Sequence, residues 1–181
     1  MLKDPLVWID LEMTGLNLRG GDVIMEAAVI VTDGQLEEVI EGPEIVIHCT
    51  DAQLDGMDEW CTEHHGQSGL TQRCRESNVT MADAEKQLLD FVTKFVPEKR
   101  RAVLAGNSIH VDKTFIDAQM PALSEHLHYR LVDVSSVKEL AKRWYPAAEA
   151  AGYAKQNTHR AMDDIRESIG ELKYYRSTFF K

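Results

Sequence analysis

The sequence predicts an α/β fold with a mixed central sheet flanked by helices, and three observations support this prediction. Three strand-like segments come first in the chain, and the Asp33-Gly34 pair between the second and the third is a strong hairpin signal. Segments with helical periodicity then take over and alternate with further short strands. We therefore expect an antiparallel meander that continues into parallel strands, with helices on both faces of the sheet.

The first three strand-like segments differ in how deeply they should be buried. The first covers about residues 5–12, carries two acidic residues near its end and stops at a Thr-Gly turn. The second, residues 23–32, is so apolar that we expect it inside the sheet, and the third is expected over 36–48.

The rest of the chain should alternate helices with short strands. The pattern is clearest over residues 81–96, where Ala84, Leu88 and Val92 recur at helical spacing and Pro97 follows the end. The expected helices are 53–65, 81–96, 111–120, 135–144 and 160–178, the expected strands are 102–105 and 129–134, and a loop is expected over 146–157.

Length and composition indicate one domain over residues 1–181, because the chain shows no internal repeat and no linker rich in Pro, Gly or Ser. No apolar run is long enough to cross a membrane, and no targeting signal opens the chain, so no membrane partner is expected. The 3 cysteines are an odd number, which favours a reducing compartment such as the cytoplasm or the mitochondrion.

The net charge of −10 restricts the partners. Affinity for long duplex nucleic acid comes from many Lys and Arg contacts with phosphates, which an acidic surface cannot supply. A ligand that carries phosphates should therefore be short or held at few points. The alternative is that the acidic surface only keeps the protein in solution.

Asp10 and Glu12 stand two positions apart on the first strand, so their side chains point to the same face of the sheet. Two carboxylates so placed repel each other and lose hydration. A hard divalent cation is the simplest compensation, because such ions prefer carboxylate oxygens. The alternative is a pair of solvated acids at the edge of a sheet.

Asp112 is a further candidate, at the start of the helix expected over 111–120 and just after the strand over 102–105. Its position at a strand end could bring it to the same site. A carboxylate in a first helical turn is also stabilised by the free N–H groups and the helix dipole, so a simple capping role stays open.

The last expected helix offers Asp163 and Asp164, and its phase separates them. At about 100° per residue, Asp164 lies on the flank of the apolar stripe that contains Ile165 and Ile169, whereas Asp163 falls nearly opposite and should face water. Asp164 is therefore the residue that can reach a site beside the sheet.

His159 lies in the loop that leads into this helix. A histidine there could swing over a metal site, and its unperturbed pKa suits a general base at neutral pH, although a plain surface histidine is the alternative. Carboxylates and a histidine that converge on one sheet end would fit two-metal hydrolysis of a phosphodiester.

These residues, in their order and context, resemble the DEDDh exonucleases of the ribonuclease H-like fold: Asp10-x-Glu12, Asp112 and His159-x4-Asp164 match the family pattern. The resemblance runs from about Leu6 to Lys181 and is strongest in four segments, which are Trp8–Leu16, Leu104–Ser108, Asp133–Leu140 and His159–Ile169.

The resemblance implies a 3′→5′ exoribonuclease that acts on very short single-stranded RNA, down to dinucleotides, and releases 5′-mononucleotides. It also implies two divalent ions, Mg²⁺ or Mn²⁺, and a homodimer. By matching motif, the metal ligands would be Asp10, Glu12, Asp112 and Asp164, and His159 would be the general base.

The same resemblance implies substrate contacts. Leu16 and Trp60 would sandwich the terminal bases, and stacking of this kind tolerates any base sequence. Taken alone, Trp60 would be a core residue of the 53–65 helix. The chain is one residue longer than the family pattern between Gly15 and Glu26, a departure that bears on the base contacts and not on the metal site.

Ser108, Arg130 and Ser135 would hold the 5′ phosphate, with Tyr129 contributed by the neighbouring subunit. A guanidinium and two hydroxyls suit a phosphate. The simpler interpretations are a charge at a strand end for Arg130 and a helix N-cap for Ser135 or Ser136.

Two other functions stay open from the sequence. The same chemistry could act on a longer or a DNA substrate, although relatives of that kind usually need a partner subunit or a more basic groove. The other possible function is that of a catalytically silent binding domain of the same fold. Loss of any of the four acids or of His159 would favour this function, but the chain has all five residues.

Overall fold

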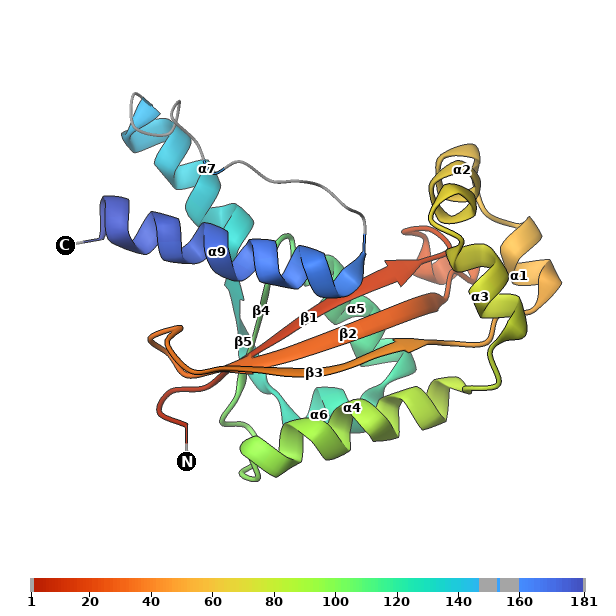
Figure 1. The fold of residues 1–181 in the computed structure, drawn as a ribbon, viewed down its shortest axis with the longest axis horizontal. Helices are drawn as coiled ribbons and strands as arrows, with labels where there is room; N and C mark the ends of the chain where they lie inside the picture. Colours follow the sequence, from red (N-terminus) through yellow and green to blue (C-terminus); the bar gives the residue numbers. More distant parts are fainter. Residues whose placement is uncertain (1, 147–152, 154–159, 181) are drawn as a thin grey trace.

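The fold is built on a five-stranded sheet with the order β3-β2-β1-β4-β5 (Figure 1). The computed structural model describes residues 2–146, 153 and 160–180. The strands are β1 (Leu6–Met13), β2 (Ile24–Thr32), β3 (Val39–Val46), β4 (Val103–Gly106) and β5 (His128–Asp133). β1 lies at the centre. β2 pairs with it along its whole length, whereas β4 pairs only with Leu6, Val7 and Trp8, so the carboxyl end of β1 extends beyond β4.

The sheet is mixed, as the sequence predicts. β1 pairs antiparallel with β2, and β2 with β3, whereas β1 pairs parallel with β4, and β4 with β5. The connection between β2 and β3 is longer than a two-residue hairpin, because the Asp33 carboxylate accepts the N–H groups of Glu37 and Glu38 and closes a wider turn.

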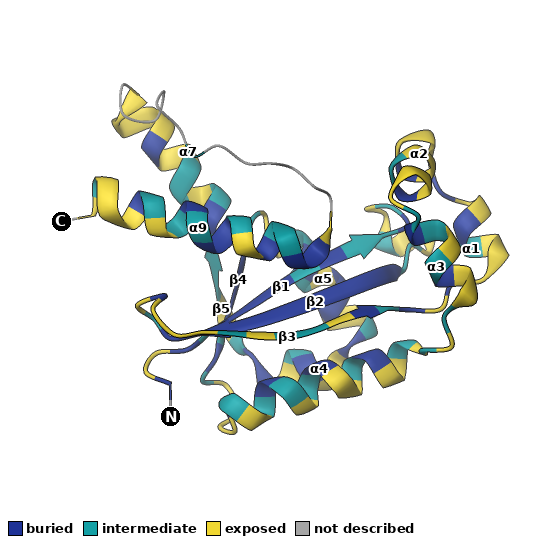
Figure 2. Ribbon diagram, viewed as in Figure 1, coloured by how far each residue is buried: buried dark blue, intermediate teal, exposed yellow. Residues whose placement is uncertain are grey.

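Helices cover both faces of the sheet (Figures 1 and 2). One face carries α4 (Met81–Phe95), α5 (His110–Gln119) and α6 (Pro121–His126), and the other carries α7 (Val134–Trp144) and α9 (Ala161–Phe179). β2 is buried along its whole length, since it lies inside the sheet and is covered on both faces.

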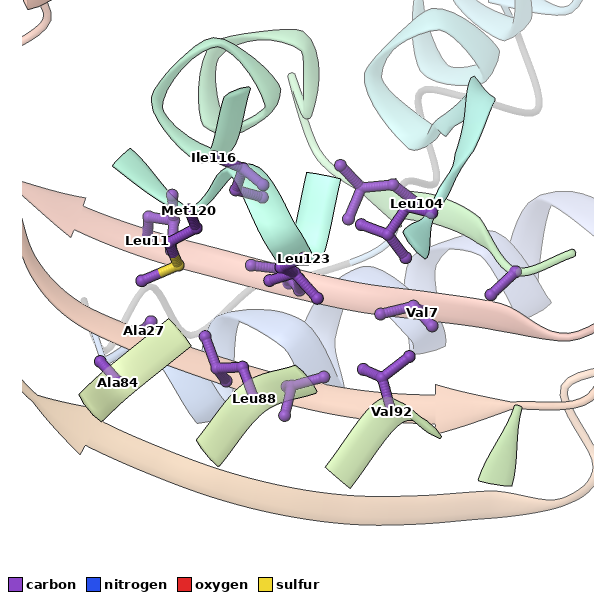
Figure 3. Close-up of a cluster of buried hydrophobic side chains, with 14 of the residues drawn as sticks. Val7, Leu11, Ala27, Ala84, Leu88, Val92, Leu104, Ile116, Met120 and Leu123 are labelled. Carbon is purple, nitrogen blue, oxygen red and sulfur yellow. The ribbon is translucent and has the colours of Figure 1, made fainter. Parts of the chain in front are cut away.

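The core on the α4 side is apolar throughout. Val7 and Leu11 of β1 share this core with Leu88 and Val92 of α4, and Leu11 lies beside Met120 (Figure 3). Thr80 begins α4 with a capping box, its hydroxyl accepting the N–H of Asp83 while the Asp83 carboxylate accepts the N–H of Thr80.

The helical region between β3 and α4 differs from the prediction of one helix over 53–65. It contains α1 (Asp51–Asp55) and α2 (Glu59–Gln67), because Thr50 and Asp58 each begin a helix by capping it. The short helices α3 (Leu70–Glu76) and α6 are also absent from the prediction. The loop expected over 146–157 lies largely outside the described residues.

α1, α2 and α3 pack on the end of the sheet through a small separate cluster that contains Met25, Leu54 and Cys74. This packing holds α2 beside the carboxyl end of β1. None of the helices in the described part of the chain is long and apolar enough to cross a membrane.

Candidate active site

Three carboxylates meet at the carboxyl end of β1. Oxygen atoms of Asp10, Glu12 and Asp164 lie within 4.8 Å of one another, and all three residues are partly buried. Alternation along the strand sends Trp8, Asp10 and Glu12 to the face that α9 covers. Trp8 packs in the core on this face, and the two acids follow it toward the carboxyl end of the strand.

The cluster is electrostatically unfavourable without a cation. The pKa of Glu12 is raised from its ordinary value of 4.5 to about 8, first because burial removes hydration and then because Asp164, Glu26 and Asp112 repel its negative charge. The carboxyl oxygens are hard ligands of the kind that Mg²⁺ and Mn²⁺ prefer. The donor set therefore fits a divalent metal.

Asp163 and Asp164 both lie in the first turn of α9, but only Asp164 belongs to this cluster. Asp163 binds the guanidinium of Arg166 at 2.7 Å on the outer part of the helix, and Arg166 also binds Glu41 at 2.7 Å. The helix phase read from the sequence therefore agrees with the positions of both residues, while the metal-binding role of Asp164 stays a prediction.

Asp112 lies next to the three-carboxylate cluster rather than within it. Its side chain is only 8% exposed, and its Oδ1 accepts the N–H of Leu11 in β1 at 3.0 Å. Burial raises its pKa from 3.8 to about 7, although the hydrogen bonds from its own N–H and from Leu11 act in the opposite direction. This contact joins the start of α5 to the strand that carries Asp10 and Glu12.

Glu26 is a buried acid to which the sequence pattern did not point. It lies opposite Glu12 in the β1–β2 ladder, is 1% exposed, and binds Arg73 of α3 at 2.9 Å. Burial raises its pKa, while Arg73 opposes this shift. The available signal was a lone glutamate within the otherwise apolar segment 23–32.

An apolar pocket of about 510 Å³ opens beside Glu12. Leu16 is 74% exposed and Trp60 is 56% exposed at its border, so Trp60 is not the core residue that the helical pattern alone would make it. The Trp60 ring stacks on His64, with 3.9 Å between the ring centroids. The residues that line the pocket are Leu11, Glu12, Met13, Gly15, Leu16, Asp58, Trp60, Cys61 and His65.

His65 connects two segments that line this pocket. Its Nε2 donates to the carbonyl oxygen of Met13 at 2.9 Å, which ties α2 to the end of β1. Its pKa is lowered, chiefly by burial, so the ring stays neutral near neutral pH. The loop between Met13 and β2 is fixed by Asp22, whose carboxylate accepts the Thr14 hydroxyl and the Asn17 N–H.

Ser108 and Ser135 come together beyond the ends of β4 and β5. Their hydroxyl oxygens are 3.2 Å apart, and the N–H of Ser108 lies 3.0 Å from Ser135 Oγ and 3.0 Å from Asp133 Oδ1. Asp133 is the N-cap of α7 and accepts the N–H of Ser135. The simpler interpretation, in which Ser135 or Ser136 caps this helix, is therefore wrong, because Asp133 is the cap.

Tyr129 and Arg130 lie on an irregular part of the edge strand β5, where the pairing with β4 shifts register between Val103 and Leu104. Both are exposed, and the Arg130 guanidinium lies 5.5 Å from the centroid of the Tyr129 ring. They fall between His128, which pairs with Val103, and Leu131, which pairs with Leu104. His159 lies outside the described residues.

Comparisons with known proteins find relatives over nearly the whole chain. A family model described as Exonuclease, RNase_T, matches residues 7–172. The chain is 56% identical over 176 residues to a probable oligoribonuclease of Schizosaccharomyces pombe, covering 97% of this chain and 69% of that one. It is 52% identical over 178 residues to an oligoribonuclease of Hydrogenovibrio crunogenus (98% and 95%), and 49% identical over 180 residues to a mitochondrial oligoribonuclease of Homo sapiens (99% and 75%).

Solved structures of exonuclease I have the same fold. Exonuclease I of E. coli in complex with a dA16 oligonucleotide superimposes with a TM-score of 0.72 at 16% identity, covering 98% of this chain and 42% of that one. The exonuclease I of Methylocaldum szegediense gives 0.68 at 17% identity, with 98% and 41% covered. The chain thus spans about two fifths of the length of exonuclease I, and the likeness confirms the predicted ribonuclease H-like fold.

Proposed function

The chain belongs to the exonuclease family that includes the oligoribonucleases, and from this membership we propose that it removes 5′-mononucleotides from the 3′ end of very short RNAs. The observation that carries the proposal is the cluster of Asp10, Glu12 and Asp164, with oxygens within 4.8 Å, beside an apolar pocket. We propose that the whole of residues 1–181 forms one exonuclease domain.

We propose that Asp10, Glu12, Asp112 and Asp164 hold two divalent ions, Mg²⁺ or Mn²⁺. When bound, such ions activate water and stabilise the leaving oxygen of a phosphodiester. Asp112 keeps one carboxylate oxygen on the Leu11 N–H, which orients its other oxygen. We propose His159 as the general base, a role that rests on its spacing from Asp164 in the motif.

The apolar pocket and the paired serines would bind opposite parts of a short substrate. Leu16 and Trp60 present apolar surface on which a base can stack without sequence preference. We propose that Ser108 and Ser135 form the 5′-phosphate site, in which the Ser108 hydroxyl donates to the phosphate, and that Arg130 adds its charge. A site that accepts both ends at once selects short oligomers, which agrees with an acidic chain that cannot hold long nucleic acid.

A length series tests the substrate. The protein is incubated in Mg²⁺ with 5′-labelled RNAs of two, five and twenty residues and with a deoxyribose dinucleotide, and the products are separated on a gel. We expect the RNA dinucleotide to be hydrolysed fastest and EDTA to stop the reaction. Equal rates on the dinucleotide and the twenty-residue RNA would contradict the short-substrate proposal, and full activity in EDTA would contradict the metal mechanism.

We further propose a homodimer in which Tyr129 reaches the neighbouring subunit's 5′-phosphate site. Tyr129 is 68% exposed on the edge strand β5, where a second chain can approach it. Sedimentation should give a species of twice 20.5 kDa, and a single 20.5 kDa species would rule out this arrangement.

The described cysteines are free, and the curated relatives include bacterial and mitochondrial proteins, so we propose the cytoplasm or the mitochondrion as the location.

A further inference from the structure

A continuous path of hydrogen bonds joins the paired serines to the helix that carries Asp164. The Ser108 N–H donates to Ser135 Oγ at 3.0 Å, and Ser135 Oγ donates to Asn107 Oδ1 at 3.0 Å. Asn107 Nδ2 donates to Ser168 Oγ at 2.7 Å, and Ser168 Oγ donates to the carbonyl oxygen of Asp164 at 2.8 Å. The path therefore runs from the end of β4 into the first turn of α9.

Every bond in this path has a fixed direction. A serine hydroxyl has one proton, so Ser135 gives its proton to Asn107, and Ser168 gives its proton to the Asp164 carbonyl. Hydrogen bonds that follow one another in a single direction strengthen each other. The Ser108 hydroxyl donates to Ser135 Oγ in this arrangement, and it is the hydroxyl that can turn to a phosphate oxygen without breaking the path.

The Asn107 amide is held in one orientation by a buried acid. Its Nδ2 also donates to Glu171 Oε2 at 3.2 Å, and Glu171 is 1% exposed. The Tyr175 hydroxyl donates to Glu171 Oε1 at 2.8 Å, and Lys138 Nζ lies 3.6 Å from the same oxygen. A reversed amide would place Asn107 Oδ1 against this carboxylate, where two acceptors would face each other. Asn107 is therefore a rigid link.

We propose that Asn107 and Ser168 are positioning residues that hold the 5′-phosphate site and the metal site at one spacing. The inference rests on the proposed function, in which the paired serines bind the 5′ phosphate. Binding energy from a remote group raises kcat only when it is used to orient the reacting bond. With the link intact, the bound 5′ phosphate aligns the other end of a dinucleotide with Asp164. With the link broken, the phosphate still binds but aligns that end less well.

The test combines Ser168→Ala with removal of the substrate phosphate. Steady-state kinetics of the full chain in Mg²⁺ are measured on an RNA dinucleotide with and without its 5′ phosphate. In the unmodified protein, kcat should be higher on the dinucleotide with the 5′ phosphate than on the one without it. In Ser168→Ala we expect this ratio of kcat values to fall by about tenfold. The corresponding ratio of KM values should change by less than about twofold. Ser177→Ala is the matched control, because its hydroxyl bonds the Tyr174 carbonyl on the exposed end of the same helix.

Asn107→Leu supplies a second variant of similar size. Its side chain can neither donate to Ser168 nor repel Glu171, so it should show the same loss of the phosphate advantage, with a circular dichroism melt to check the fold. An equal fall in kcat for both substrates, or no change, would overturn the proposal. Hydrolysis by the unmodified protein without any phosphate advantage would overturn this inference alone, whereas absence of hydrolysis would overturn the proposed function as well.

Discussion

The two faces of β1 show different chemistry although they belong to the same eight residues. On the α4 side, Val7, Ile9 and Leu11 are all buried in one apolar core. On the α9 side, Trp8 is buried in a second core, but Asp10 and Glu12 follow it and meet Asp164. The raised pKa of Glu12 shows that the acidic half of this face opposes folding when no cation is bound.

The difference teaches that the two faces do separate tasks. Burial of apolar surface on the α4 side, at about 25 cal/mol per Å², stabilises the fold. The acids on the α9 side lower the stability of the fold, and their proposed role is to bind metal ions in the active site. Substitutions on the α4 face should therefore reduce stability with little change in kcat, and substitutions of the acids should do the reverse.

The largest expected effect is on activity. Asp164→Ala should lower kcat by on the order of a thousandfold, equivalent to about 4 kcal/mol of barrier, because the cluster loses a ligand. Asp163→Ala should stay within about threefold of the unmodified protein, because Asp163 binds Arg166 on the outer part of the helix. Kinetics on an RNA dinucleotide check both, and the reverse ranking would show that the helix phase has been misassigned.

The next effect is on stability. Leu88→Ala removes a fully buried side chain of α4 and should lower the free energy of unfolding by about 2–5 kcal/mol. Leu140→Ala, at a half-exposed position of α7, should cost much less. Urea unfolding followed by circular dichroism measures both. A loss of kcat per folded molecule in Leu88→Ala as large as that in Asp164→Ala would contradict the separation of the two faces.

The acidic half of the face could be predicted from the sequence because simple periods position its residues. Strand alternation places Asp10 and Glu12 together, and helix phase selects Asp164 over Asp163. The Glu26–Arg73 pair depends on how α3 packs, which no local pattern encodes. The phosphate-site residues came from the family resemblance alone.

The helical region around Trp60 shows the limit of periodicity. A helical pattern over 53–65 ignores two capping residues, Thr50 and Asp58, that begin separate helices. α2 begins at Glu59, directly after the break, and Trp60 in its first turn is exposed and lines one pocket with Glu12. The link through Asn107 also escaped prediction, because its members come from the loop after β4, from α7 and from α9, and meet only in the folded chain.

Proton binding offers a third test of the comparison. Glu12 has a pKa of about 8 in the folded chain against an ordinary 4.5, and Asp112 about 7 against 3.8. At a pH between the ordinary and the raised pKa of each group, that group is protonated in the folded chain and ionised in the unfolded chain. In EDTA, stability should therefore be greatest near pH 5 and fall toward pH 8, by at most about 1.4 kcal/mol per pH unit for each proton.

Added Mg²⁺ should reverse this trend, because the ion binds the deprotonated carboxylates and so stabilises the folded chain most at high pH. Thermal unfolding at pH 5, 6.5 and 8, with EDTA or Mg²⁺, measures both effects. Glu12→Gln should flatten the pH dependence in EDTA. A stability in EDTA that rises from pH 5 to pH 8 would contradict the view that these acids oppose folding.

The smallest expected effect concerns Trp60, which borders the pocket from outside both cores. Trp60→Ala should raise KM for an RNA dinucleotide by about tenfold, because stacking of one base is worth about 1–3 kcal/mol. The free energy of unfolding should change by less than about 0.5 kcal/mol, since the indole is exposed. Trp60→Phe keeps a ring and should raise KM only about twofold. If Trp60→Ala instead destabilised the protein as much as Leu88→Ala, Trp60 would belong to the core, and the pocket beside Glu12 would lose its stacking surface.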